Sequence, residues 1–393
     1  MEATKIKDPT RDRYHAIALS SVWSLDLLRN SSALVVGAGA LGNEVAKNLA
    51  MMGIRLIVIA DRDRVEVANL TRSVFFRESD HGRLKSEVLS ERLVELNPDV
   101  TVLPVSGDLE ETIGLGLIRR VDMIFSCLDN RLARKAINRM CQKVGRAWVD
   151  GSMENLLGDA VLYLPDEGPC YECTLTRIDK ELMRQSIPCK GIAVKNINLG
   201  KVPTISTMGS IIAALQVQEG LKTLHGQLKG SLAGKRLVVN CLMNDIYTTQ
   251  VERKEDCEGH FRFGAINEVP QWTRAIVTPR DILNRFNEDT GREGHLALGR
   301  DVVIGLTCAK CDATEEEVEL LHLLSMERAI CFKCGEVRDP VKINTIRADD
   351  PYADWPLKKL RIPPLEVLEV KSGSSKAWYE ITGDLETDLF GLL

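Results

Sequence analysis

The first half of the chain alternates short apolar runs with segments of helical periodicity. Uninterrupted apolar runs of this kind are typical of strands buried on both faces of a parallel sheet. The runs that we interpret as strands are Leu34–Val36, Leu56–Ala60, Val100–Val105, Val121–Leu128, Arg146–Asp150 and Gly158–Leu164. Strands that alternate with helices predict an α/β fold, here a Rossmann-like doubly wound sheet.

A glycine-rich turn follows the first of these strands. Gly37, Gly39 and Gly42 have the spacing Gly-x-Gly-x-x-Gly, and a helix-period segment comes directly after them. Glycines at this spacing let backbone N–H groups approach a phosphate at the start of a helix. Asp61 ends the second strand about 20 residues later, where nucleotide-binding βαβ units carry an acid for the ribose. The pattern predicts nucleotide binding, and a purely structural turn is the alternative.

The segment after Asp61 carries polar and basic residues that a dehydrogenase does not need. They are Asp63, Asn69, Arg72 and Lys85. Cations that neutralise the charge of a triphosphate are typical of phosphoryl chemistry. We therefore predict that this cluster holds ATP, and the alternative is that its basic residues are solvated surface charges.

Asp129 and Asn130 come at the carboxyl end of the strand that ends at Leu128. Open α/β sheets bind their ligands at this end of their strands. Asp129 is therefore a candidate ligand for Mg²⁺, with Asn130 beside it and Arg134 about one helical turn further on. The alternative role for Asp129 is to cap the following helix.

Composition narrows the class of protein. The chain has 393 residues, of which 44% are hydrophobic and 27% charged, with a net charge of −5. These values are typical of a globular protein of two or three domains and predict no general attraction to nucleic acid or membranes. No apolar run reaches about 18 residues, so we expect no membrane span. The first residues lack the apolar core of an export signal, and the eleven cysteines then favour a reducing, cytoplasmic location.

Seven cysteines and one histidine form two sets with the spacing of tetrahedral zinc sites. The first set is Cys170, Cys173, Cys257 and His260. The second set, with the spacing C-x2-C-x19-C-x2-C, is Cys308, Cys311, Cys331 and Cys334. Four protein ligands with no open position are typical of structural zinc. We predict two structural zinc ions, and a non-metal role for the second set is the alternative.

Four cysteines remain outside these sets. Cys127, Cys141 and Cys241 lie in or beside apolar elements, and we expect them in the core. Cys189 lies in a polar segment and is followed by Lys190. Neighbouring positive charge favours the thiolate, which is the nucleophilic form. We predict that Cys189 is a catalytic nucleophile, and an exposed thiol without a function is the alternative.

The order of these motifs resembles the ubiquitin-activating enzyme superfamily, whose simpler members are the ThiF-like adenylyltransferases of thiamine and molybdopterin biosynthesis. The resemblance covers residues 11–260 and is carried by GAGALG, IADRDRVEVANLTRSVFF, GRLKSE, CLDNRLAR and PCYEC, in this order. It implies that the three glycines line the nucleotide and that Asp61 binds the ribose. It also implies that Asn69, Arg72 and Lys85 hold the phosphates and that Asp129 holds Mg²⁺.

The resemblance also bears on assembly and on the nucleophile. Relatives of this core generally pair, so a homodimer is expected, although Ala16 stands where the family often has an arginine that reaches the partner's site. The segment VPTISTMGSIIAALQVQEGLK resembles the helix that follows the active-site cysteine in compact members that activate ubiquitin-like proteins. This second similarity supports Cys189 as the nucleophile.

The sequence predicts three parts. Residues 1–262 form the adenylation domain, with the active-site cysteine segment at 185–200, and residues 263–347 form a zinc-binding module. Residues 348–393 form a C-terminal tail with a hairpin about Gly373. The tail is similar to the terminal segment of some ubiquitin-activating enzymes, which docks the conjugating enzyme; a structural tail packed on the core is the alternative. At the other end, Arg11–Leu28 is predicted to be one helix packed on the nucleotide domain.

The function implied by the resemblance is ATP-dependent activation of a ubiquitin-like protein. The enzyme would adenylate the substrate's C-terminal carboxylate, form a thioester on Cys189 and pass the acyl group to a conjugating enzyme. The nearest alternative is an adenylyltransferase of a sulfur-carrier protein, without a thioester step. A catalytically silent scaffold and an NAD-dependent oxidoreductase are further alternatives, and the phosphate-binding cluster disfavours both. The cofactors expected are ATP, Mg²⁺ and two structural Zn²⁺.

Overall fold

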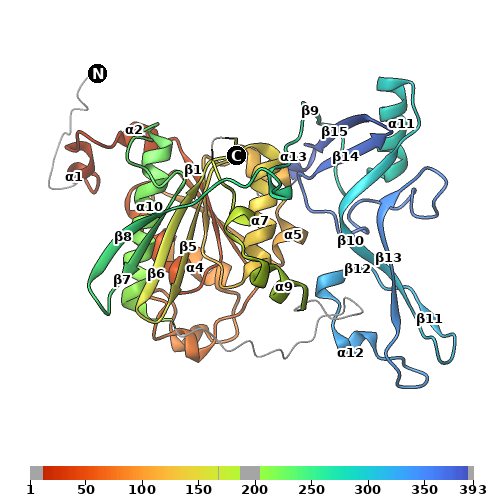
Figure 1. Cartoon of the computed structure of the whole chain (residues 1–393), viewed down its shortest axis with the longest axis horizontal. Coiled ribbons are helices and arrows are strands. Elements are labelled where there is room, and N and C mark those ends of the chain that lie inside the picture. The colour runs from red at the N-terminus through yellow and green to blue at the C-terminus, as the bar shows by residue number, and fades with distance from the viewer. Residues whose placement is uncertain (1–11, 167, 186–203, 388–393) are drawn as a thin grey trace.

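The computed structural model describes residues 12–166, 168–185 and 204–387. These residues form two sheets, one of eight strands and one of seven. The first sheet and its helices lie on the left of Figure 1, and the second sheet forms a module on the right. Within the described ranges, no helix combines the length and the apolar character needed to cross a bilayer.

The first sheet has the strand order β3-β2-β1-β4-β5-β6-β7-β8. Strands β1 to β5 pair in parallel, and β6 to β8 extend the sheet with antiparallel pairs. The order β3-β2-β1-β4-β5 is that of a Rossmann-type sheet, which confirms the predicted α/β fold. The bounds are β1 (Ser32–Val36), β2 (Leu56–Asp61), β3 (Thr101–Ser106), β4 (Met123–Ser126), β5 (Trp148–Glu154), β6 (Leu157–Tyr163), β7 (Lys235–Asn240) and β8 (Asp245–Gln250).

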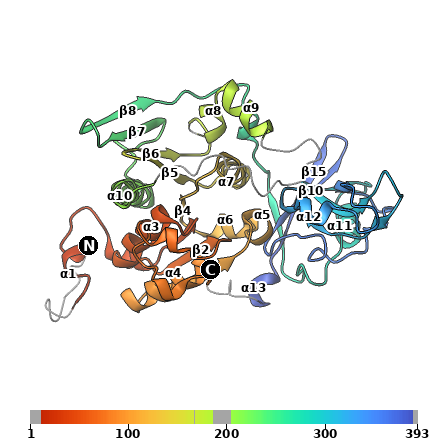
Figure 2. The same cartoon turned by 90° about the horizontal axis from the view of Figure 1, so that it is seen from below.

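Alternate residues of β1 enter two different hydrophobic cores. Ala33 and Val35 pack with residues of α3, α4 and α10, whereas Leu34 and Val36 pack with residues of α6 and α7. Because successive side chains of a strand point to opposite faces, every residue of β1 is buried and apolar or small. Figure 2 shows the helices on both faces of the sheet. Their bounds are α3 (Ala40–Met51), α4 (Lys85–Leu96), α5 (Leu109–Thr112), α6 (Leu115–Arg120), α7 (Arg131–Val144), α8 (Tyr171–Thr174), α9 (Arg177–Gln185) and α10 (Ser206–Leu224).

The N-terminal segment forms two short helices, α1 (His15–Ala18) and α2 (Leu25–Arg29), instead of the single helix that we predicted. The hydroxyl of Ser20 accepts hydrogen bonds from the backbone N–H groups of Val22, at 3.1 Å, and Trp23, at 3.3 Å. Such local side-chain bonds compete with the helical hydrogen-bond pattern and interrupt it between α1 and α2.

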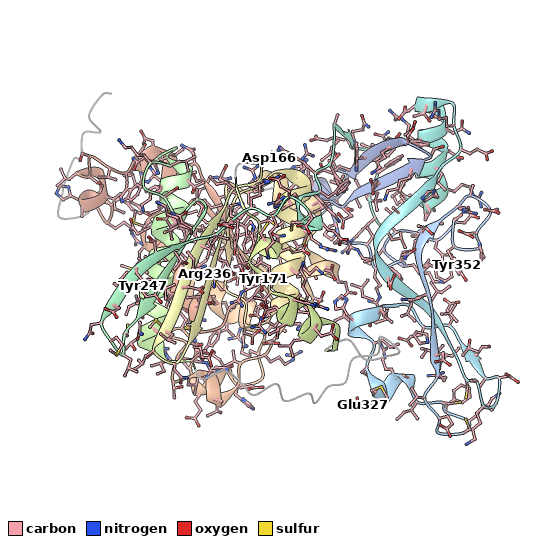
Figure 3. All side chains as sticks on the ribbon, in the orientation of Figure 1. Asp166, Tyr171, Arg236, Tyr247, Glu327 and Tyr352 are labelled. Atoms are coloured by element: carbon pink, nitrogen blue, oxygen red, sulfur yellow. The ribbon has the colours of Figure 1, made fainter. Side chains whose placement is uncertain are left out.

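The outer strand β8 forms one edge of the first sheet, and no other described strand pairs with its outer side. All six of its residues are exposed, including Ile246 and Tyr247, and the adjoining Leu242 and Met243 are exposed as well. Figure 3 shows Tyr247 at the edge that lies farthest from the second module. An exposed apolar edge strand is a surface on which another chain can pair.

The second module is a sheet that packs on helix α11 (Pro279–Thr290). Ile282 and Phe286 of α11 are buried with residues of β10 and β14 in a core of their own. The strands are β9 (Ile266–Val269), β10 (His295–Thr307), β11 (Thr314–Glu315), β12 (Glu319–Leu320), β13 (Asp339–Ile346), β14 (Val367–Ser372) and β15 (Ser375–Ile381). Two further helices are α12 (Met326–Ala329) and α13 (Asp384–Thr387).

The C-terminal residues are an integral part of this second sheet. Strand β14 pairs antiparallel with β10, and β15 pairs parallel with β9. The hairpin predicted about Gly373 is confirmed, and Gly373 has a φ of +58°. Val370 and Tyr379 share the core with Phe286, so the hairpin supplies part of the apolar surface that the zinc module needs. The boundary predicted at residue 348 therefore does not separate two folded units.

The two modules meet along α6 and the residues just before it. Leu365 and Val367 of the second module are buried in the same core as Leu115 of α6. A Cβ added at Gly114 would lie 2.0 Å from the carbonyl oxygen of Pro364. The backbones of the two modules therefore approach as closely as a glycine allows.

A buried carboxylate also joins the modules. Glu380 of β15 is fully buried, and it pairs with both Arg119 and Arg120 at the end of α6. Burial raises the pKa of Glu380, and the two arginines oppose this shift. Glu268 pairs with the same arginines at 3.3 and 3.8 Å, but its side chain is 50% exposed. The interface thus offers two carboxylates with the same partners and different burial.

Glu380→Ala is expected to lower the free energy of unfolding by about 3 kcal/mol, because it leaves two partly buried arginines without their main partner. Glu268→Ala is the matched control and should change it by less than about 1 kcal/mol, as is usual for an exposed ion pair. Urea unfolding followed by tryptophan fluorescence measures both values. Equal effects of the two substitutions would contradict the importance that we give to the buried pair.

Candidate active site and metal centres

The glycine loop lies between β1 and α3, at the carboxyl edge of the first sheet. Gly37 has a φ of +98°, which favours glycine, and a Cβ at Gly42 would lie 1.8 Å from the Gly37 carbonyl oxygen. In contrast, a Cβ at Gly39 would meet no atom within 4 Å. In front of Gly39 the loop is open, and α3 begins at Ala40 without a side-chain cap. An anion placed there would meet free N–H groups and the positive end of the helix dipole.

Asp61 joins the end of β2 to this loop. Its carboxylate accepts hydrogen bonds from the backbone N–H groups of Ala38, at 2.6 Å, and Asp63, at 2.7 Å. Burial raises the pKa of Asp61, and both hydrogen bonds and the charge of Lys85 oppose the shift. The structure therefore brings the predicted ribose-binding acid against the predicted phosphate loop.

Lys85 and Asp63 form an ion pair at the same edge. Their Nζ–Oδ2 distance is 3.0 Å, and the Lys85 backbone N–H donates to the Asp63 carbonyl oxygen at 2.9 Å. The side chain of Lys85 is only 11% exposed, whereas that of Asp63 is 59% exposed. Asp63 thus holds a nearly buried ammonium group close to Asp61, where a phosphate could replace it as the partner of Lys85.

Asn69 and Arg72 lie on the loop that follows β2. The side-chain oxygen of Asn69 accepts a backbone N–H bond within the loop at 2.9 Å, and the Arg72 guanidinium donates to the Ala68 carbonyl oxygen at 2.6 Å. Asn43 of α3 accepts a hydrogen bond from the Phe75 N–H at 3.2 Å, so the loop is tied to the helix behind the glycine loop. We did not predict this role of Asn43, because no motif in the sequence indicates that its side chain binds the loop. Contact of Asn69 and Arg72 with phosphates stays a prediction.

Asn130 caps α7, and Asp129 does not. The Asn130 side chain accepts a hydrogen bond from the Ala133 N–H at 2.8 Å. Asp129 is exposed, and among the described residues its carboxylate has one hydrogen-bond contact, a long one of 3.5 Å with the Asn130 amide. The capping alternative for Asp129 is therefore not what the structure shows, and its carboxylate remains available to a cation.

Arg134 stabilises the loop that carries Asp129. Its guanidinium donates to the carbonyl oxygen of Leu128 at 2.6 Å and pairs with Asp150 at 3.2 Å. Burial raises the pKa of Asp150, and Arg134 opposes this shift. We did not predict a role for Asp150 at the site, although it ends a predicted strand as Asp61 does. Because Arg134 is engaged by protein groups, its predicted contact with the cofactor stays a prediction.

The structure describes three of the four cysteines that lie outside the predicted zinc sets. Cys141 is buried, and Cys127 and Cys241 pack against the first core, as predicted. Burial raises the thiol pKa of Cys127 and of Cys141, which disfavours the nucleophilic thiolate. Cys189, the predicted nucleophile, lies outside the described residues.

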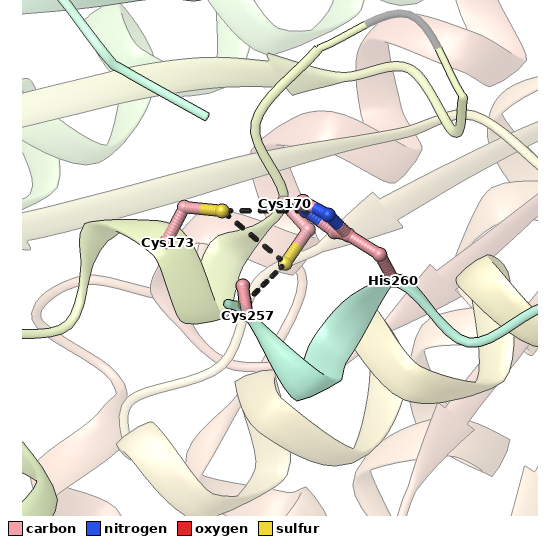
Figure 4. Close-up of side chains that lie close together, drawn as sticks. All are labelled: Cys170, Cys173, Cys257 and His260. Atoms are coloured by element: carbon pink, nitrogen blue, oxygen red, sulfur yellow. Dashed lines mark hydrogen bonds between the residues drawn. The ribbon is translucent and has the colours of Figure 1, made fainter. Parts of the chain in front are cut away.

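The first predicted zinc set comes together between α8 and the turn η3 (Glu258–His260), as Figure 4 shows. The Sγ atom of Cys170 lies 3.9 Å from that of Cys173 and 3.6 Å from that of Cys257. The Cys173 Sγ lies 3.3 Å from His260 Nε2. Thiolates about 2.3 Å from a tetrahedral zinc ion are about 3.8 Å apart, so these residues fit a zinc ion.

The second predicted set also converges. Cys308 and Cys334 have an Sγ–Sγ distance of 3.5 Å, and Cys311 and Cys331 have one of 3.7 Å. All four sulfur atoms lie within 4.8 Å of one another. Each close pair joins the turn after β10 to the turn after α12, so an ion here would connect the two turns. The donor set again fits a closed, structural zinc site.

The ThiF family matches residues 13–259, which is most of the first module and more than half of the chain. The chain belongs to the ThiF family. The match includes the glycine loop, Asp61, Lys85, Asp129 and the first cysteine pair, and it ends before the second sheet.

Three curated relatives of this ThiF-family chain illustrate its range. The ubiquitin-like modifier-activating enzyme 5 of Dictyostelium discoideum is 30% identical over 248 residues, 60% of this chain and 62% of the relative. The adenylyltransferase and sulfurtransferase MOCS3 of the same organism is 29% identical over 266 residues, 67% of this chain and 58% of the relative. The sulfur carrier protein ThiS adenylyltransferase of Escherichia coli K12 is 30% identical over 205 residues, 51% of this chain and 78% of the relative. The chain spans about three fifths of the first two relatives.

Solved structures show the same fold. The microcin C7 biosynthetic enzyme MccB in complex with N-formylated MccA has a TM-score of 0.54 at 22% identity, over 65% of this chain and 77% of that one. E. coli MccB with ATP has a TM-score of 0.52 at 23% identity, over 64% and 75% of the two chains. At these identities the likeness supports the fold alone.

Each chain of this ThiF-family protein is expected to carry two zinc ions, and Cys331→Ser should reduce the content to one. Because closed zinc sites contribute folding free energy, a chelator should lower the melting temperature. Elemental analysis and thermal unfolding measure the two effects, and Cys241→Ser, outside both sets, is the control that keeps two ions. One ion or none in the wild type would contradict the assignment.

Proposed function

We propose that this protein is an ATP-dependent adenylyltransferase that activates the C-terminal carboxylate of a small protein. One relative is named as an activating enzyme of a ubiquitin-like modifier and another as the adenylyltransferase of a sulfur carrier protein, which supports this substrate class. The observation that carries the proposal is the carboxyl edge of the first sheet. The space in front of Gly39, the nearly buried Lys85 and the available carboxylate of Asp129 lie at the ends of neighbouring parallel strands or beside them.

The first step joins two anions. A carboxylate oxygen of the substrate attacks the α-phosphorus of ATP, the bond to the bridging oxygen breaks, and pyrophosphate leaves with that electron pair. The products are an acyl-adenylate and pyrophosphate. Arg72 and Lys85 would neutralise the charge that develops on the phosphates, and Asp129 would hold the Mg²⁺ that accompanies ATP. Asn69 and the glycine loop would orient the triphosphate.

In the second step the thiolate of Cys189 would attack the acyl carbon and release AMP, and the resulting thioester would pass to a conjugating enzyme. The high thiol pKa that burial gives to Cys127 and Cys141 leaves both as poor nucleophiles, which supports Cys189. The relatives named for MOCS3 and ThiS support the alternative, in which the adenylate is used for a sulfur-carrier protein without this thioester.

Assembly and docking are proposals of the same kind. We infer a homodimer, and the exposed apolar edge at Ile246 and Tyr247 supports a pairing surface; a molar mass in solution of twice the 43.7 kDa of one chain would support the dimer, and 43.7 kDa would contradict it. A conjugating enzyme that used the C-terminal region would meet β14 and β15 inside a folded sheet, not as a free tail. A cytoplasmic location also stays a prediction.

Asp129→Ala and Arg72→Ala are each expected to lower substrate-dependent exchange of pyrophosphate into ATP by about 100-fold, the usual effect of removing one charge contact at such a site. Arg77→Ala is the matched control, because Arg77 is an exposed arginine on the same loop and has no role in the proposed site. Wild-type exchange in the folded Asp129 or Arg72 variant would overturn that residue's role.

Cys189→Ala should leave pyrophosphate exchange intact and abolish the thiol-sensitive adduct with the substrate, because only the second step needs the thiolate. Exchange assays and non-reducing gels measure the two steps separately, and Cys241→Ala should affect neither. An adduct that persists in Cys189→Ala would place the nucleophile elsewhere. A wild-type protein that exchanges pyrophosphate without forming an adduct would favour the sulfur-carrier alternative.

A further inference from the structure

A histidine of the second module reaches the carboxyl edge of the first sheet. His322 lies on the turn η4 (Leu321–Leu323) between β12 and α12. Its Nε2 lies 3.1 Å from an oxygen of Asp108, and its Nδ1 lies 3.5 Å from an oxygen of Glu110. The other oxygen of Asp108 lies 3.3 Å from the Arg62 guanidinium. A continuous set of polar contacts thus runs from the zinc module to the residue directly after Asp61.

The position of Asp108 places these contacts beside the proposed nucleotide. In the parallel pair of β2 and β3, Asp61 is in register with Ser106, and the Gly107 N–H donates to the Asp61 carbonyl oxygen at 3.4 Å. Asp108 therefore follows the strand end next to Asp61. With the phosphates at the end of β1 and the ribose at the end of β2, the base, on the far side of the ribose, extends toward the end of β3.

The cluster is satisfied as a set of ion pairs and does not need a metal. The two ring nitrogens of His322 face two different carboxylates, and each carboxylate can only accept hydrogen bonds. A single cation could bind only one of these nitrogens. The imidazolium form, which has two N–H donors, meets both acceptors at once.

We infer that Arg62 contacts the base of ATP, and that His322 of the second module is a positioning residue that holds Asp108, and through it Arg62, in place. The inference rests on the proposed nucleotide site. The Arg62 side chain is 59% exposed and thus accessible to a ligand, whereas that of Asp108 is only 14% exposed and is held by contacts with both Arg62 and His322. A planar guanidinium can stack on an aromatic ring, which a lysine cannot do. The second module thereby completes the nucleoside end of the site.

The protonation state of His322 gives the contact a pH dependence. Burial opposes the charge, but the hydrogen bond to Asp108 and the charges of Asp108 and Glu110 outweigh it and raise the pKa of His322, with Arg62 acting in the other direction. The stabilisation is therefore fully present below the ordinary histidine pKa and is lost as pH rises through the raised value. The ratio of the ATP affinities of wild type and His322→Ala should fall over that range.

The test compares ATP with inorganic tripolyphosphate, which has the phosphates but no base, in calorimetric titrations of the full chain. His322→Ala and Arg62→Ala should each weaken ATP binding about 5- to 10-fold, the loss expected for one charge-assisted contact, and leave tripolyphosphate binding unchanged. His322→Gln, whose neutral amide keeps an N–H donor group but does not titrate, should recover part of the affinity without the pH dependence. Arg361→Ala is the control, because Arg361 pairs with Glu111 at 3.0 Å across the same interface.

The outcomes separate this inference from the proposed function. ATP binding by folded His322→Ala that equals wild type, or an equal loss for ATP and tripolyphosphate, would overturn the positioning role and leave the nucleotide site standing. A wild-type protein that binds neither ligand would instead overturn the proposed function itself, and the inference with it.

Discussion

The hydrogen bond from the Ala38 N–H to the Asp61 carboxylate, at 2.6 Å, fixes the geometry on which the candidate site depends. It holds the glycine loop against the end of β2. The same carboxylate accepts the N–H of Asp63, and Asp63 in turn pairs with Lys85 at the start of α4. Three elements at the carboxyl edge are thus linked through one half-buried acid. A site that must hold ATP and a carboxylate in line benefits from such fixed supports, because a small displacement of the reacting groups greatly reduces the rate.

The second module contributes to the same edge, although the ThiF family match does not extend over it. Its backbone packs against Gly114, its Glu380 pairs with two arginines of α6, and its His322 contacts Asp108. These contacts all involve the short segment between β3 and β4. A change in the second module can therefore reach the carboxyl edge of the first sheet through a few residues.

The sequence allowed much of the first module to be predicted, for physical reasons that particular elements illustrate. β1 is apolar at nearly every position because both of its faces are buried, and Gly37 and Gly42 are required by a positive φ and by a close backbone approach. Both predicted zinc sets could be proposed because each is built from pairs of ligands three residues apart, which is a local signal, although the two pairs of the first set lie 87 residues apart. The break between α1 and α2 was not, since it depends on one serine hydroxyl that competes with the helix.

Long-range pairings could not be predicted, because the signals that we used in the sequence are local. The hairpin about Gly373 has a local turn signal, but nothing in the sequence indicates that β14 pairs with β10, which joins His295 to Lys371. The contact of His322 with Asp108 spans 214 residues and is made by two ordinary polar side chains. The position of Asp150 in the sequence could have identified it as a site residue, because it ends a predicted strand at the carboxyl edge, where ligands bind.

The transfer of an oxygen isotope tests the central claim most directly. A candidate small protein whose C-terminal carboxylate carries ¹⁸O is incubated with the enzyme, ATP and Mg²⁺, and the AMP is analysed by mass spectrometry. If the carboxylate attacks the α-phosphorus, its oxygen becomes the bridge of the acyl-adenylate and stays with AMP when the acyl carbon is attacked. We predict one ¹⁸O atom in each AMP released. AMP without the label, or cleavage of ATP to ADP and phosphate, would contradict the account.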